Sequence, residues 1–109
     1  MSADNQIIVL AYRTAHPEAA WKYAAMKIGH PSDLQCQDYA FDYAKELAGR
    51  KEWFWFDGPG ASGRARKMAR LLTEEHVANG WILEYENILF VECSEVDGGV
   101  WYLPIPRRD

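Results

Sequence analysis

Apolar residues form a continuous run near the start of the chain and recur with helical spacing after it. The run over 6–12 is rich in β-branched side chains, which predicts a strand buried on both faces at a central position of a sheet. Farther on, Pro17 suits a first helical turn, and Trp21 and Ile28 share one helical face with the alanines between them. We therefore expect a first helix that ends before Gly29.

Two more helices are predicted from capping signals. Ser32 and Gln35 have the spacing of a capping box, and the apolar stripe that follows extends to Gly49. A third helix is expected from about Gly63 to Ala78, because Asn79-Gly80 is typical of a helix stop in the left-handed conformation. About three helices are therefore expected in the chain.

The remaining apolar segments predict strands, over 53–56, 81–85, 88–91 and 100–103. Asp97-Gly98-Gly99 before the last segment is a strong hairpin signal, and Pro104 confines that strand to a sheet edge or to its own end. The order of elements predicts one α+β domain over residues 1–109, with a mainly antiparallel sheet and the helices packed on one face.

Charge narrows the classes of partner. The net charge of -4 and the pI near 5.3 make nucleic-acid binding unlikely as a function, since phosphate contacts normally require a basic surface. The chain shows no signal-peptide pattern and no apolar run near the ~20 residues of a membrane span, so a cytoplasmic protein is expected.

Neither a metal nor another cofactor is expected. Cys36 and Cys93 are isolated and form no CxxC, which favours free thiols. His16, His30 and His76 do not show zinc-ligand spacing with either cysteine. No GxSxG is present, and no pair of side chains has the pattern of a catalytic site, so we expect no catalytic residue.

A glycine-rich loop provides the first candidate site. Gly58, Gly60 and Gly63 satisfy GxGxxG between a predicted strand and a predicted helix, where backbone N–H groups can approach a phosphate, and Arg64 and Arg66 would add positive charge. The proline between the first two glycines removes one donor, and a flexible connection into a helix would have the same composition. The loop indicates a phosphate-bearing ligand as one alternative.

Aromatic residues provide the second candidate site. Phe 4, Trp 5 and Tyr 6 add to 15, more than so small a core is expected to enclose. Tyr39 and Tyr43 share a helical face away from the apolar stripe, and Trp53, Trp55 and the basic Arg70 extend the candidate partner-binding set. A protein partner or a homodimer contact is the expected use of this surface.

The opening Met1-Ser2-Ala3-Asp4-Asn5, the segment Tyr12-Arg13-Thr14-Ala15-His16 and the late segment over 83–88 resemble small uncharacterised proteins of tailed phages and prophages. Those proteins typically begin Met-Ser-Ala-Asp-Asn-Gly; here Gln6 replaces the glycine, and Glu86-Asn87 departs from the group again. The resemblance implies a phage accessory gene and carries over no catalytic residue. The function expected is binding of a protein, for example a host defence or regulatory component; the alternative is a small nucleotide- or phosphate-binding protein.

Overall fold

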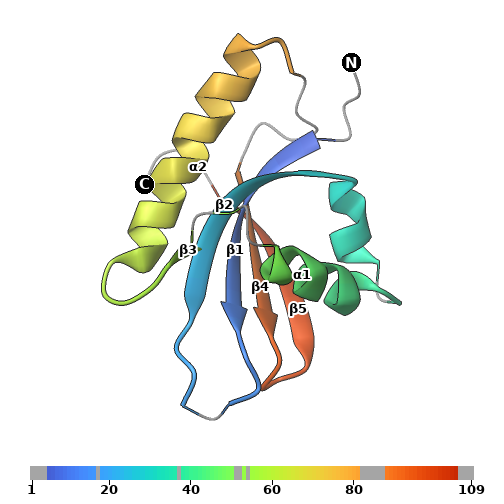
Figure 1. Cartoon of the computed structure of the whole chain (residues 1–109). Coiled ribbons are helices and arrows are strands. Elements are labelled where there is room, and N and C mark those ends of the chain that lie inside the picture. Colours follow the sequence, from blue (N-terminus) through green and yellow to red (C-terminus); the bar gives the residue numbers. More distant parts are fainter. Residues whose placement is uncertain are drawn as a thin grey trace.

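The structure is a computed structural model of the 109-residue chain, and it describes residues 5–16, 18–36, 38–50, 53, 55–81 and 88–105. In chain order its elements are β1 (Asn5–Arg13), β2 (Lys22–Gly29), the 3-10 helix η1 (Pro31–Gln35), α1 (Ala40–Gly49), β3 (Trp55–Phe56), α2 (Ala61–Ala78), β4 (Ile88–Ser94) and β5 (Gly99–Ile105) (Figure 1). They form a small α+β domain, which confirms the predicted fold class.

The strands described by the structure form one mixed sheet in the order β3-β2-β1-β4-β5. The pairs β1–β2, β2–β3 and β4–β5 are antiparallel, whereas β1 and β4 run parallel, with Ile8 opposite Leu89. The central position predicted for the first strand is confirmed. Because β1 and β4 are parallel, the chain needs a long crossover between them, and this crossover contains both α-helices.

The helix predicted between Pro17 and Gly29 is wrong, because residues 22–29 form β2. This segment pairs with β1 along its whole length, from Tyr12 opposite Lys22 to Asn5 opposite Gly29. Its residues 24–26 are all buried, so both faces of the strand are covered and no alternation marks it as a strand. Sheet pairing overrides the helical preference of its alanines.

The second predicted helix is divided in two. η1 begins after His30, which has a positive φ of 52°, and Pro31 occupies its first turn, so Ser32 is not the helix cap. The backbone becomes extended at Cys36, and α1 starts only after Tyr39. The third helix is confirmed: α2 covers Ala61–Ala78 and is followed by Gly80 with a φ of 85°.

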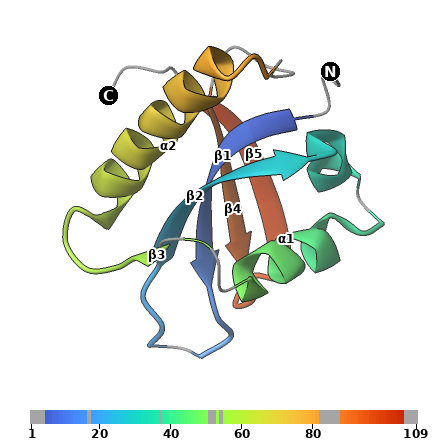
Figure 2. The same cartoon turned by 45° about the horizontal axis from the view of Figure 1, so that its top comes forward.

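The prediction that the helices pack on one face of the sheet is also wrong. Alternate residues of β1 belong to two separate cores, one containing Ile8 and Leu10 and the other containing Ile7 and Val9. Leu47 of α1 packs in the first core, and Ala65 of α2 packs in the second. We call these two sides of the sheet the α1 face and the α2 face (Figure 2). A central strand buried on both sides needs a cover on each side.

The shorter predicted strands are confirmed in part. Within the expected 53–56 segment, Trp55 and Phe56 pair in the sheet as the edge strand β3, and residue 54 lies outside the described part of the chain. β4 and β5 form the hairpin expected at Asp97-Gly98-Gly99, and β5, which contains Pro104, lies at the other edge. Most of the strand expected over 81–85 falls outside the described residues.

Candidate binding surfaces

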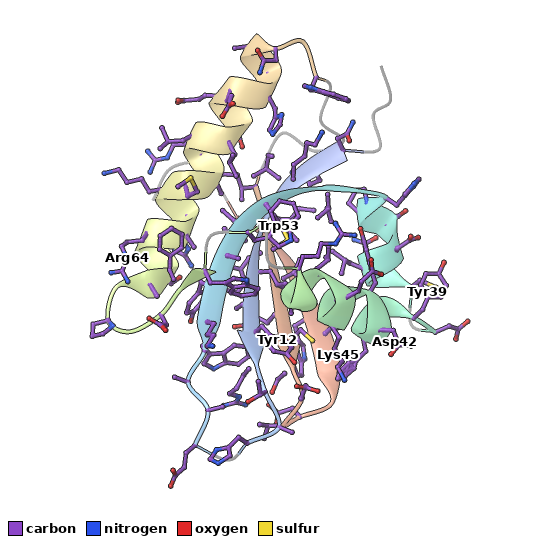
Figure 3. The ribbon with its side chains drawn as sticks, in the orientation of Figure 1. Tyr12, Tyr39, Asp42, Lys45, Trp53 and Arg64 are labelled. Carbon is purple, nitrogen blue, oxygen red and sulfur yellow. The ribbon has the colours of Figure 1, made fainter. Side chains whose placement is uncertain are left out.

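The glycine loop connects β3 to α2, and the side chain of Arg64 binds to the loop itself. Gly58 and Gly60 have φ values of 78° and 77°, a conformation that favours glycine. The guanidinium of Arg64 donates hydrogen bonds to the carbonyl oxygens of Asp57 at 2.9 Å and Pro59 at 3.0 Å. Figure 3 shows Arg64 beside the loop at the start of α2. Both terminal nitrogens of the Arg64 guanidinium thus donate to the loop and help to close it.

The remaining residues of that candidate site are distributed along α2. Gly63 is exposed in the first turn of the helix, close to the loop. Arg66 lies elsewhere, with its guanidinium carbon 5.7 Å from the centre of the Phe90 ring on β4. The structure therefore brings the three glycines and Arg64 together and separates Arg66 from them. Anion binding by this loop stays a prediction.

The two predicted contact tyrosines have different environments. Tyr39 is 49% exposed at the start of α1, and its hydrogen bond to Cys36 is the main cause that raises its pKa. Tyr43 is half-buried, and its hydroxyl donates to the carbonyl oxygen of Gly29 at 2.7 Å. Burial raises the pKa of Tyr43. Tyr43 thus joins α1 to the end of β2, and Tyr39 is the one of this pair that is accessible to a partner.

The other predicted partner residues do not join Tyr39 in one surface. Trp53 and Trp55 are half-buried and pack against the core of the α1 face. The indole N–H of Trp53 is buried and has no acceptor among the residues that the structure describes. Arg70 belongs to α2, on the other face of the sheet. The predicted set therefore divides among three places.

A groove that the sequence did not reveal lies at the start of α1, where Ala40 directly follows Tyr39 in the chain. It has a volume of about 440 Å³, and its lining comes from η1, the start of α1 and the β4–β5 turn: Leu34, Gln35, Ala40, Phe41, Gly98, Gly99 and Val100. The hairpin at Gly98 was predictable, but its position against α1 depends on contacts between distant parts of the chain. The groove thus combines the aromatic ring of Phe41 with the small residues Gly98 and Gly99 of the turn.

A polar network holds the β4–β5 turn in place. Tyr12 donates a short hydrogen bond to the carboxylate of Glu95, and Lys45 of α1 forms an ion pair with the same carboxylate at 3.0 Å. These two contacts lower the pKa of Glu95, and burial together with the Glu95 contact raises that of Tyr12. Arg13 also reaches the turn, through Asp97 at 2.9 Å. The turn that lines the groove is thus tied to both β1 and α1.

The charge beside the groove is negative. Asp38 and Asp42 are exposed, and among the described residues the structure shows no ion pair to either of them. Among the described residues, Lys45 of α1 is engaged with Glu95, and Arg50, which follows α1, is engaged with Glu46. Figure 3 shows Asp42 and Lys45 on α1 and Tyr39 just before the helix begins. The surface around Tyr39 thus presents unpaired carboxylates.

In the described part of the chain, no group of three or more His, Cys, Asp or Glu side chains could hold a metal ion. No helix there is long and apolar enough to cross a membrane. Comparison of the chain with protein-family models, with curated proteins and with solved structures gave no match.

Proposed function

We propose that this protein acts by binding another protein, as a phage-type accessory protein without catalytic activity of its own. The proposed binding surface is the groove of about 440 Å³ together with the exposed ring of Tyr39. We call this the groove surface. A large, half-exposed aromatic ring at the same end of α1 as a hollow lined by Leu34, Phe41 and Val100 is typical of the anchor points that contribute most of the energy in protein interfaces. This pairing is the observation that carries the proposal.

The acidic rim indicates the chemistry of the partner. Asp38 and Asp42 lie beside the groove surface, and the cations near them are paired within the chain. A partner segment with an apolar side chain for the groove and with Lys or Arg at its flanks would complement both features. Opposite charges across an interface mainly raise the association rate and the specificity. The resemblance to phage proteins makes a host protein the expected source of this segment.

The rigidity of the groove surface also favours binding. Lys45 and Tyr12 both hold Glu95, and Tyr43 holds α1 against the end of β2. A surface that is already ordered loses little conformational entropy when a partner binds. The hydrogen bond and ion pair to Glu95 therefore position the β4–β5 turn for binding, in addition to stabilising the fold.

The test starts with capture of partners from host lysate and continues with the purified partner. We expect Tyr39→Ala and Asp42→Lys each to weaken its binding, with Tyr39→Ala costing about tenfold or more because truncated aromatic anchors cost ~2 kcal/mol. Leu71→Ala and Glu74→Lys are matched controls, since both residues are exposed on α2, on the other face of the sheet. Melting temperatures establish that each variant is folded.

Two outcomes would contradict the proposal. Unchanged affinity in both α1 variants would remove the groove surface as the binding site. Equal losses in the α2 controls would place the interface on the other face. If the captured partner is a second copy of this chain, sedimentation of the same four variants shows whether the groove surface forms that dimer contact.

A further inference from the structure

A second cavity, distinct from the groove, opens on the α1 face near the edge of the sheet formed by β3. It has a volume of about 330 Å³ and lies between the ends of β1 and α1, the β1–β2 connection and β3. This volume is at the lower end of the ~300–1,000 Å³ typical of small-molecule pockets. The space suits a small metabolite and is too small for a dinucleotide or a peptide. We call it the β3 pocket.

The apolar part of the β3 pocket combines one large ring with small side chains. Trp55 of β3 lines it, together with Ala19, Ala20 and Ala48. Trp55 is half-buried, and among the described residues it is paired in the sheet opposite Ala24. Because alanines leave the space in front of the indole unfilled, a flat apolar group can stack there.

Among the residues that the structure describes, the polar part of the β3 pocket contains one available cation, Lys22. Lys22 lies directly opposite Tyr12 in the β1–β2 register, so both side chains project to the α1 face. The hydroxyl of Tyr12 is engaged with Glu95, which in turn is paired with Lys45. Lys22 is exposed and forms no ion pair with any residue that the structure describes. Its ammonium can therefore bind an acidic group of a ligand.

One available anion complements this cation. Asp57 directly follows Phe56, the end of β3, and Phe56 pairs with Tyr23, the neighbour of Lys22 in β2. Asp57 and Lys22 both line the β3 pocket, yet no ion pair joins them. An exposed carboxylate and an exposed ammonium thus stand at the same pocket without neutralising each other directly.

We propose that the β3 pocket binds a free aromatic α-amino acid. Its ring would stack on Trp55, its carboxylate would pair with Lys22, and its ammonium would pair with Asp57. The balance of one cation and one anion favours a zwitterion over a nucleotide, whose phosphate would also be repelled by Asp57 and by the net charge of -4. This proposal is independent of partner binding at the groove surface.

The test measures binding of L-tryptophan, tryptamine and indole-3-propionate by calorimetry and by saturation-transfer NMR. L-Tryptophan should bind tightest, and each analogue should bind about tenfold more weakly, because each loses one charge-assisted hydrogen bond worth ~1.5 kcal/mol or more. Lys22→Met should weaken L-tryptophan and indole-3-propionate but not tryptamine. Asp57→Asn should weaken L-tryptophan and tryptamine but not indole-3-propionate.

The controls make the outcome decisive. Lys67→Met removes an exposed cation from α2 and should leave all three affinities unchanged. Ala48→Phe fills the pocket and should abolish binding. If that variant fails to fold, Lys22→Met and Asp57→Asn still test the proposal. No binding of L-tryptophan at about 5 mM would overturn the proposal, since the binding free energy would then be weaker than ~3 kcal/mol. A mononucleotide that binds more tightly than L-tryptophan would also overturn it. So would an equal loss of L-tryptophan affinity in all variants, the Lys67→Met control included.

Discussion

The two helices cover the two faces of the sheet in different ways. α2 is 18 residues long and buries small side chains four residues apart: Ala61, Ala65, Ala69 and Thr73. α1 is 10 residues long and buries Ala40, Ala44 and Leu47, with Phe41 and Tyr43 packed at their sides. A stripe of alanines lets a helix backbone approach the strands closely, whereas large side chains hold a helix farther off and interlock with the core.

This difference also separates their chemistry. α1 has polar ties to other elements, through Tyr43 to Gly29 and through Lys45 to Glu95. Both cavities described above lie on its face of the sheet. The long helix leaves large apolar side chains exposed, with Leu71 at 54% and Val77 at 52%. A short helix does not cover a whole sheet face, and hollows remain at its two ends.

The largest expected effect in this comparison is on the core under α1. Leu47 is fully buried among residues of β1, β2 and β4, and Leu47→Ala should lower the free energy of unfolding by about 2–5 kcal/mol through lost burial and a new cavity. Chemical denaturation measures this change. Leu71→Ala on α2 is the control and should stay within ~0.5 kcal/mol, because that side chain is exposed. Equal effects would mean that α1 does not interlock with the core.

A smaller effect is expected from enlarging the alanine stripe of α2. Ala65 is fully buried against the core of Ile7 and Val9, so Ala65→Leu should cost about 1–3 kcal/mol by overpacking. Ala78→Leu, at an exposed position near the end of the same helix, is the matched control. Denaturation curves of the two variants give the comparison. A neutral or stabilising Ala65→Leu would show that α2 is not closely packed.

The smallest effect concerns acid stability through the tie between α1 and the β4–β5 turn. The folded state lowers the pKa of Glu95 below its ordinary value of 4.5, first through Tyr12 and then through Lys45. The ionised carboxylate therefore stabilises the fold above that pH, and this contribution is lost as the pH falls through the lowered value. The melting temperature of the native protein should exceed that of Glu95→Gln at about pH 6, and this difference should decrease as the pH is lowered to about pH 3.

An exposed carboxylate on the other face provides the reference for this pH series. Glu74 of α2 is exposed, and Glu74→Gln should differ from the native protein by a nearly constant amount over the same range. If the Glu95→Gln difference is equally constant, the carboxylate of Glu95 does not hold the turn through its charge.

Much of the fold followed from local signals. The continuous apolar run over 6–12 correctly indicated a central strand, since only burial on both faces tolerates so many apolar residues in sequence. Gly80 and Gly98 correctly marked the end of α2 and the hairpin turn, because both positions have a positive φ that glycine adopts at little cost. Pro104 correctly limited β5 to an edge.

The errors have a common cause in non-local pairing. β2 was predicted as a helix because a strand buried on both faces carries no alternation and its alanines favour helices. The helices were placed on one face because no local pattern states which side of the sheet a helix will cover. For the same reason the two cavities could not be anticipated, although Trp55, Tyr39 and the turn at Gly98 were each singled out.

By itself, the sequence determined the central strand, the long third helix, the final hairpin and the α+β class, because these depend on periodicity and on residues with strong backbone preferences. The tertiary structure alone decided the parallel pairing of β1 with β4, the strand at 22–29 and the opposite placement of α1 and α2. It also decided which polar side chains meet, as Tyr12 and Lys45 do at Glu95, and it placed Lys22 and Asp57 at one pocket. These features depend on contacts between residues far apart in the chain, for which a single sequence contains no local signal.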